Sequence, residues 1–267
     1  MVAITMGDAA GTGPELIVKA LAGGALRDRC RPLVVGDVPT MERALQFTGA
    51  AAKIRGVATP AAARFSPEAI DVLDLRNLEL SRLKLGQVDA MAGKAAYEYV
   101  KAATELALAG RVAAVVTSAI NKEALNLAGY HYDGHTGLLA ELCAAPDATM
   151  MLAVDNLRVS HVSTHVSLRE AIDRVQPERI IRVLRLTHDA VRNLGVAAPR
   201  LAVAGLNPHA GEHGLFGDEE EKFIAPAIAE ARRLGLDARG PFPGDTVFFR
   251  AMQGEFDAAI AMYHDQG

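Results

Sequence analysis

The chain contains 267 residues, half of them apolar, and its formal net charge is −4 at pH 7. This length allows a large buried core, either as one α/β unit or as two lobes that share a cleft. Positive and negative side chains are interspersed, which excludes the basic surface that nucleic acids and anionic membranes attract. The N-terminus has neither the basic segment nor the long apolar run of a signal peptide or membrane span. We therefore expect a cytoplasmic protein with reduced thiols at Cys30 and Cys143.

Short apolar runs alternate along the chain with segments of helical periodicity. This alternation is typical of βα units, whose strands form mostly parallel sheets. We predict a two-lobed α/β fold with helices on both sides of the sheets, in which residues 1–129 form the first lobe and residues 130–267 the second. The turn-rich segment 126–137 is where the lobes are expected to meet. The predicted strands are residues 2–5, 32–36, 113–118, 149–154, 200–205 and 258–263.

The first predicted strand leads into a glycine-rich segment, residues 7–13, and a helix that starts at Pro14. This order also occurs in nucleotide-binding sites, and Asp37 follows the next strand, about where a ribose-binding acid would lie. The glycine spacing differs from a dinucleotide-binding motif, however, and Glu15 would compete with a phosphate for the helix dipole. A tight turn that needs glycine for backbone reasons is the simpler interpretation.

Further helices have recognisable start signals. The tripeptide Ser-Pro-Glu at 66–68 offers an N-cap, a first-turn proline and an acid, which predicts a helix. Ser167 and Glu170 have the spacing of a capping box. The longest helical pattern spans residues 93–109, and one of its faces is expected to pack into the core. That face contains Tyr97, Val100, Ala103 or Thr104, and Leu108.

Three predicted strands are followed by a histidine: His165, His209 and His264. Loops at the carboxyl ends of parallel strands converge, and three imidazoles that leave one coordination position open are typical of a catalytic metal site. Each histidine could instead lie in a separate loop without a ligand. Pro208 and Asp265 favour the metal site, because a fixed backbone angle and a nearby carboxylate can orient an imidazole.

The other histidines differ in their surroundings. His161 lies within a strand pattern and His188 within a helix pattern, so we predict structural roles for both. His131 and His213 lie in polar loops and are expected at the surface. His135 precedes a predicted helix in the sequence Asp-Gly-His-Thr-Gly, residues 133–137, where Thr136 can cap the helix and free backbone N–H groups can bind an anion. A His135–Thr136 pair therefore suits a phosphate group.

Seven segments resemble the 4-hydroxythreonine-4-phosphate dehydrogenase family, the PdxA type of vitamin B6 synthesis. The resemblance covers essentially the whole chain, and LNPHAGE and MYHDQG are its longest and most specific motifs. Within the family, NKEALNLAG and HAGEHGLFGDEE favour the branch that acts on D-threonate or D-erythronate 4-phosphate. The segments are GDAAGTGPE, TSAINKEAL, YDGHTG, STHVSLRE, LNPHAGEHGLFGDEE, GPFPGDTVF and AMYHDQG.

The resemblance implies a fold similar to isocitrate and isopropylmalate dehydrogenases and a homodimer whose active site is shared between lobes and subunits. The family's three metal ligands, which come from both subunits, match the three strand-end histidines named above. Its substrate-binding His-Thr pair matches His135 and Thr136. Acids at the same site match Asp245 and Asp265, and a nearby lysine matches Lys122. Any of these last three could move the proton of the substrate hydroxyl.

The implied function is a metal-dependent oxidoreductase that uses NAD or NADP to oxidise and decarboxylate a 4-phosphorylated hydroxy acid. The substrate would be 4-hydroxythreonine 4-phosphate, in pyridoxine and pyridoxal phosphate biosynthesis, or D-threonate 4-phosphate, in sugar-acid catabolism. Imidazole ligands suit zinc, cobalt or manganese better than magnesium. The alternatives are a cis-dihydrodiol carboxylate dehydrogenase and a truncated metal-binding dimer without catalytic activity.

The chain departs from the family pattern in two ways. Ala9 and Thr12 replace the usual proline and isoleucine of the glycine-rich turn, and Gly137 replaces the acid that usually follows the His-Thr pair. The sequence also ends at Gly267, whereas family members continue with residues for the substrate phosphate and NAD. We therefore expect either the front part of a longer protein or a protein that has lost its cofactor half.

Overall fold

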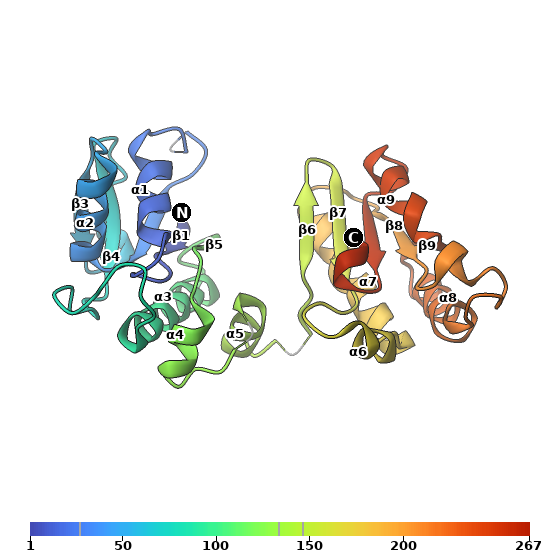
Figure 1. Ribbon diagram of the computed structural model, residues 1–267. Coiled ribbons are helices and arrows are strands. Elements are labelled where there is room, and N and C mark those ends of the chain that lie inside the picture. Colours follow the sequence, from blue (N-terminus) through green and yellow to red (C-terminus); the bar gives the residue numbers. More distant parts are fainter. Residues whose placement is uncertain (27, 133, 146) are drawn as a thin grey trace. The chain divides into compact units, whose positions relative to one another are not determined.

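A computed structural model describes residues 1–26, 28–132, 134–145 and 147–267, and in it the chain forms two α/β units (Figure 1). The first unit is Met1–Pro146 and the second is Asp147–Gly267. Each unit has a five-stranded sheet and a hydrophobic core of its own. The prediction of an α/β fold with mostly parallel sheets is confirmed.

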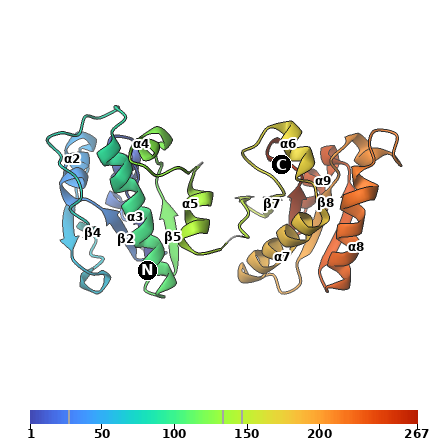
Figure 2. The ribbon, with the colours of Figure 1, turned by 90° about the horizontal axis from the view of Figure 1, so that it is seen from below.

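The sheet of the first unit is entirely parallel, with the strand order β3-β4-β2-β1-β5. Helix α3 packs on β1, β2 and β5, and α1 packs on α2 (Figure 2). The strands are β1 (Val2–Thr5), β2 (Pro32–Gly36), β3 (Lys53–Val57), β4 (Ala69–Asp74) and β5 (Ala114–Thr117). The helices are α1 (Gly13–Ala22), α2 (Val38–Thr48), α3 (Ala90–Leu108), α4 (Lys122–Leu127) and α5 (His135–Leu142), with a 3-10 turn at Pro60–Ala62.

The second unit has the strand order β6-β7-β10-β8-β9, in which β6 alone pairs in the antiparallel direction. The strands are β6 (Met151–Val154), β7 (Leu157–His161), β8 (Arg200–Ala204), β9 (Asp237–Phe242) and β10 (Ala258–Ala261). The α-helices are α6 (Leu168–Asp173), α7 (Pro177–Asn193), α8 (Ala225–Arg233) and α9 (Gly244–Met252). A π-helical turn covers Glu220–Ile224, and 3-10 turns cover Pro208–Gly211 and His264–Gln266.

The glycine-rich turn after β1 is compact for backbone reasons. A Cβ atom on Gly7 would lie 2.4 Å from the carbonyl oxygen of Ala119, and one on Gly13 would lie 2.2 Å from that of Met6. Asp37 is buried and caps α2, because its carboxylate accepts a hydrogen bond from the Thr40 amide at 2.9 Å. The simpler interpretation of this segment, a tight turn, is therefore supported.

Two helix start signals have different outcomes. Ser167 caps α6 as predicted, with its hydroxyl accepting from the Glu170 amide at 3.2 Å. The helix predicted after Ser66 is wrong, since β4 begins at Ala69 and pairs with β2 and β3. A short apolar run such as AIDVLD carries too little periodicity to distinguish helix from strand, and here pairing with neighbouring strands decides.

The predicted helix at 93–109 is confirmed as α3, but its expected core face is only partly correct. Leu108 is exposed, whereas Tyr99 is fully buried and its hydroxyl donates to the Asn77 side-chain oxygen at 2.8 Å. The helix packs on the sheet and on α4. It therefore buries a broader surface than one apolar stripe. Its buried residues are Ala92, Gly93, Ala95, Ala96, Tyr99, Val100, Ala103 and Thr104.

The division between the units falls 17 residues later than predicted, after residue 146 instead of residue 129. The reason is that the segment after α4 packs back onto the first unit. Tyr130 stacks on Tyr97 of α3 with ring centroids 3.8 Å apart, and α5 also contacts α3. His135 and Thr136 therefore belong to the first unit, not to the second.

Two further sequence expectations can be compared with the structure. Among the described residues, no helix combines the length and hydropathy that a bilayer crossing requires. Cys30 and Cys143 are both free, as predicted.

Candidate active site

Four neighbouring parallel strands of the second unit, β7, β10, β8 and β9, end at the same edge of the sheet. The connections that follow them carry, in chain order, His165, His209, Asp245 and the pair His264–Asp265. Ligands collect at this edge of an open α/β sheet because the loops converge there while the strands stay rigid. The strand-end positions predicted for the three histidines are confirmed.

His165 and His264 lie side by side. Their ring centroids are 5.5 Å apart, and both rings line one pocket together with Asp265. The Asp265 carboxylate contacts the His264 Nδ1 atom at 2.8 Å. A carboxylate on one ring nitrogen fixes the orientation of an imidazole and leaves its other nitrogen for a ligand. His264 is therefore held in a geometry that suits a metal ligand.

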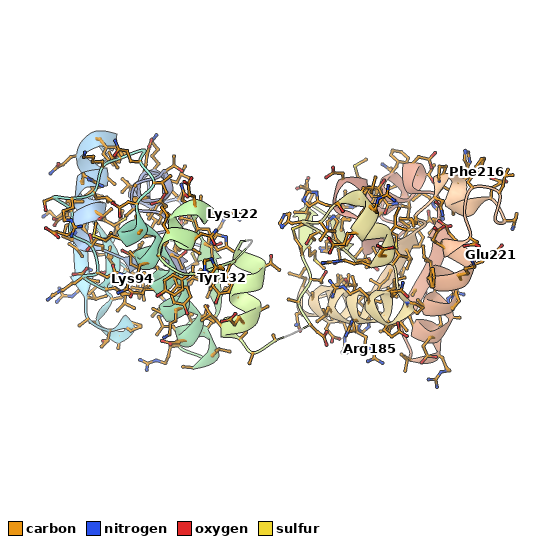
Figure 3. The ribbon with its side chains drawn as sticks, turned by 60° about the horizontal axis from the view of Figure 1, so that its bottom comes forward. Lys94, Lys122, Tyr132, Arg185, Phe216 and Glu221 are labelled. Carbon is orange, nitrogen blue, oxygen red and sulfur yellow. The ribbon has the colours of Figure 1, made fainter. Side chains whose placement is uncertain are left out.

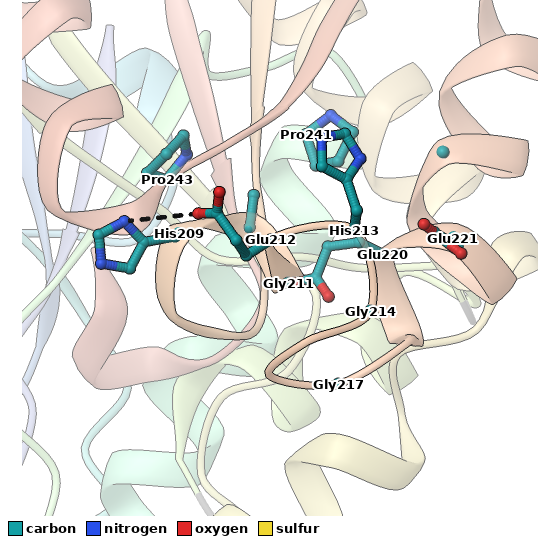
Figure 4. A pocket seen from close by; sticks show the side chains of 12 residues that line it. His209, Gly211, Glu212, His213, Gly214, Gly217, Glu220, Glu221, Pro241 and Pro243 are labelled. Carbon is teal, nitrogen blue, oxygen red and sulfur yellow. Dashed lines mark ion pairs between the residues drawn. The ribbon is translucent and has the colours of Figure 1, made fainter.

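His209 lies in a loop with unusual backbone geometry. Four residues of this loop that are not glycine have left-handed φ angles: His209 (53°), Ala210 (54°), Glu212 (44°) and His213 (56°). Such a conformation costs about 1 kcal/mol or more for each residue, so the surrounding structure must hold it. The exposed His209 ring lies 4.0 Å from the Glu212 carboxylate, measured from Nδ1 (Figure 4).

Asp245 lies at a second pocket, which adjoins the first. It lies in the first turn of α9, and this second pocket is lined by His209, Asp245, Asp265 and Gln266. Asp265 borders this pocket and the pocket of His165 and His264 as well. The acids and histidines predicted for the second unit thus surround two adjoining pockets at one sheet edge.

A single chain does not by itself form a complete metal site. In the described ranges, no group of three or more His, Cys, Asp or Glu side chains is arranged to hold a metal ion. The prediction assigns the ligands to two subunits, so it is not tested by one chain and stays a prediction. The donor chemistry does fit a divalent ion, because three neutral imidazoles with a carboxylate behind one of them suit zinc, cobalt or manganese.

His161 was predicted to lie in a strand with a structural role, and its strand position is confirmed, but its closeness to the candidate site was not predicted. It ends β7, is fully buried, and its ring centroid lies 5.8 Å from that of His264. Neither of its ring nitrogens has a hydrogen-bond partner in the part of the chain that the structure describes. Burial is the main cause that lowers the pKa of His161, which favours the neutral ring. The signal in the sequence was a histidine within an apolar strand pattern, four residues before His165.

The first unit carries its predicted site residues at the starts of α4 and α5, the two helices that follow β5. Lys122 is the first residue of α4, and the Lys122 side chain is exposed (Figure 3). The N-cap of this helix is Asn121, whose side-chain oxygen accepts from the Ala124 amide at 3.0 Å. His135 is the first residue of α5, and its Nε2 atom is buried without a partner among the described residues. Burial lowers the pKa of His135, and the backbone of Ser118 partly opposes this shift.

One local expectation for this segment is wrong. Thr136 lies within the first turn of α5 and is exposed, and the N-cap position is Gly134 without a side-chain cap. The cap predicted for Thr136 therefore does not form. Asp133 of the same motif lies outside the described residues.

Comparison with known proteins identifies the family. The family model described as "Pyridoxal phosphate biosynthetic protein PdxA" matches residues 28–267, which is most of the chain. The chain belongs to the PdxA family. The predicted family membership is confirmed.

Several relatives are similar over the whole chain. The D-threonate 4-phosphate dehydrogenase of Cupriavidus necator is 46% identical over 268 residues, covering 100% of this chain and 80% of the relative. The D-threonate 4-phosphate dehydrogenase of Salmonella typhimurium is 49% identical over 269 residues, with 100% and 81% covered. Because such PdxA relatives are dehydrogenases, the prediction that this chain is a dehydrogenase is confirmed.

Solved structures agree with this assignment. A 4-hydroxythreonine-4-phosphate dehydrogenase from Klebsiella pneumoniae matches with a TM-score of 0.94 and 47% identity, covering 100% of this chain and 82% of that one. A terephthalate 1,2-cis-dihydrodiol dehydrogenase from Burkholderia xenovorans matches with a TM-score of 0.69 and 32% identity, covering 100% and 80%. Dehydrogenases that are named for chemically different substrates therefore share this fold.

Proposed function

We propose that this PdxA-family chain is a metal-dependent NAD(P) dehydrogenase that oxidises and decarboxylates a 4-phosphorylated hydroxy acid. The observation that carries the proposal is the convergence of four strand ends in the second unit, which gathers histidines and acids around two adjoining pockets. A homodimer that shares these residues between subunits would complete the ligand set. D-threonate 4-phosphate is the favoured substrate, since the relatives at 46% and 49% identity carry that name.

The residues of the second unit have distinct proposed roles. His165, His209 and His264 would hold the divalent ion, and Asp265 would orient His264 through the contact at 2.8 Å. A divalent ion held by these histidines would supply stabilisation of negative charge on the substrate oxygen, and a bound nicotinamide would supply the hydride acceptor. Asp245 borders the adjoining pocket together with His209 and Asp265 and makes no such orienting contact among the described residues, so it is a candidate to accept the hydroxyl proton.

The first unit would bind the phosphate. The Nε2 atom of His135, buried without a partner among the described residues, and the hydroxyl of Thr136 lie at the start of α5, and both can donate hydrogen bonds to an anion. Lys122, exposed at the start of α4, is a second candidate for proton transfer or for an ionic contact with the substrate.

The direct test is NADH or NADPH formation by the protein expressed from its complete reading frame. The assay uses 4-hydroxythreonine, D-threonate and D-erythronate 4-phosphates with added Zn²⁺, Co²⁺ or Mn²⁺. We expect turnover of one of these substrates, loss of turnover with a chelator, and loss in His209→Ala. His131→Ala is the matched control, because His131 is an exposed loop histidine that contacts only Asn126 among the described side chains. Absence of turnover on all three substrates contradicts the proposal.

A second function has one observation in its favour, the similarity to a cis-dihydrodiol dehydrogenase at 32% identity. The same assay separates the two functions. Turnover of a cis-dihydrodiol carboxylate without any need for a phosphate group would support the second function. Dependence on the phosphate, and its reduction in His135→Ala, would support the first.

A further inference from the structure

The loop that carries His209 encloses a buried carboxylate that belongs to Glu220. This side chain is 3% exposed, although it carries an ionisable group. Its Oε1 atom accepts hydrogen bonds from the backbone amides of Leu206 and Asn207, both at 2.7 Å. Its Oε2 atom accepts from the Asn207 side-chain amide at 2.9 Å. No ion pair with a lysine, arginine or histidine is recorded for it within the described segments, so three N–H groups of the loop compensate its burial.

Two glycines of the loop, one on each side of His209 in the sequence, lie against the Glu220 carboxylate. A Cβ atom on Gly211 would lie 2.7 Å from Oε2, and one on Gly205 would lie 3.0 Å from Oε1. Gly205 directly follows β8, and Gly211 follows His209 by two residues. The loop therefore wraps around the Glu220 carboxylate, and glycine is needed where it approaches most closely.

Glu220 also occupies a special position in its own element. It begins the π-helical turn Glu220–Ile224, which leads into α8. Its neighbour Glu219 accepts from the same Asn207 amide at 2.6 Å, so two consecutive carboxylates hold one asparagine. Asn207 is followed by Pro208, whose fixed φ angle transmits this orientation to His209. Hydrogen bonds to the carboxylates of Glu219 and Glu220 thus fix the start of the His209 loop, which has left-handed backbone geometry.

We propose that Glu220 is the positioning residue for His209. Its buried carboxylate fixes the direction in which the His209 imidazole leaves the loop, and so sets the geometry of a metal ligand that it does not itself contact. This inference rests on the proposed function, in which His209 binds the divalent ion. Partners that orient a metal ligand typically change metal affinity by about 10- to 100-fold when they are removed.

The test compares Glu220→Gln with Glu221→Gln in the protein of complete length. Both changes remove one negative charge, but Glu221 is the exposed neighbour on the same turn (Figure 3). In Glu220→Gln, the side-chain amide opposes the Asn207 amide, donor against donor. We expect faster hydrogen exchange of the amides at 206–217 in the metal-free protein, about 10- to 100-fold weaker Co²⁺ binding, and a changed Co²⁺ visible spectrum. Glu221→Gln should match the wild type in all three.

The outcomes distinguish this inference from the proposed function. If wild type and His209→Ala have the same Co²⁺ affinity and spectrum, His209 is not a ligand and the proposed function fails, whatever the exchange data show. If His209→Ala alters the spectrum but Glu220→Gln does not alter spectrum, affinity or exchange, the role of Glu220 is overturned. Should Glu220→Gln fail to fold by circular dichroism, Glu220→Asp keeps the charge and shortens its reach, and wild-type Co²⁺ affinity in that variant overturns the role as well.

Discussion

Replacing Gly93 by alanine should disturb the candidate site of the first unit through the packing of two helices. Gly93 lies in α3 where α4 crosses it. An added Cβ atom would lie 2.1 Å from the carbonyl oxygen of Ala124 and 2.7 Å from the amide nitrogen of Leu125. Both of these are backbone atoms of α4, so no side-chain rotation relieves the contact. The distance of 2.1 Å must grow by about 1.3 Å or more, to at least 3.4 Å, before it becomes an ordinary contact, so the two helices must separate.

The expected cost follows from this separation. Overpacking costs about 1–3 kcal/mol, and contacts with backbone atoms that cannot rotate away place this change in the upper part of that range, at about 2–3 kcal/mol. The better helix propensity of alanine offsets roughly 1 kcal/mol of it. We expect a net loss of about 1–2 kcal/mol in the free energy of unfolding, measured by urea denaturation. Because Lys122 begins α4, a displacement of this size should also lower kcat/KM by up to about 100-fold.

Gly23→Ala is the matched control for this experiment. A Cβ atom on Gly23 has no neighbour within 4 Å among the described residues, and its φ of −75° is open to alanine. Its unfolding free energy should change by less than about 0.5 kcal/mol, with unchanged kcat/KM. A Gly93→Ala variant as stable and as active as this control would show that the close approach of α3 and α4 at Gly93 does not position Lys122.

Three further predictions concern individual side chains. Asp89 accepts hydrogen bonds from the amides of Met91 and Ala92 at 2.7 and 3.3 Å. Asp89→Ala should therefore lower the free energy of unfolding by about 1 kcal/mol in urea denaturation. An unchanged urea midpoint would contradict the role of Asp89 as the cap of α3. Burial lowers the pKa of His135 in the folded state, so the unfolded state binds the proton more readily. The free energy of unfolding should therefore fall as the pH drops below about 6.5. His135→Gln should reduce this dependence of stability on pH. The hydrogen bond from Arg200 lowers the pKa of Asp257, so this carboxylate stabilises the fold above its ordinary pKa of 3.8 and loses that effect as the pH falls further. Asp257→Asn should be less stable than the wild type at pH 7, and its stability should depend less on acid. Equal acid sensitivity of the two proteins would contradict this prediction.

The sequence predicted the strand ends better than the loops that follow them. Apolar runs placed His165, His209 and His264 at strand ends because buried parallel strands read as continuous apolar segments. The hydrogen bonds of Glu220 could not be predicted, since they join it to residues 13 and 14 positions away through a loop with left-handed backbone geometry. The contact of His161 with His264 likewise depends on the pairing of β7 with β10.

The remaining differences have the same origin in tertiary packing. Residues 66–68 carry helix start signals, but pairing of the next segment with β2 and β3 makes it a strand. The turn-rich segment after α4 read as a boundary, yet stacking of Tyr130 on Tyr97 joins it to the first unit. Local signals describe a segment by itself, and neither strand pairing nor ring stacking between distant segments is part of them.

If the proposed function is right, three strand-end imidazoles from two subunits bind one divalent ion. Anomalous X-ray scattering from zinc-loaded crystals of the protein locates that ion. We expect one anomalous peak for each site, about 2.0–2.1 Å from a ring nitrogen of His165, His209 and His264, with both protomers contributing. A peak at other residues, or rings too far apart to share an ion in the assembled protein, would contradict the claim.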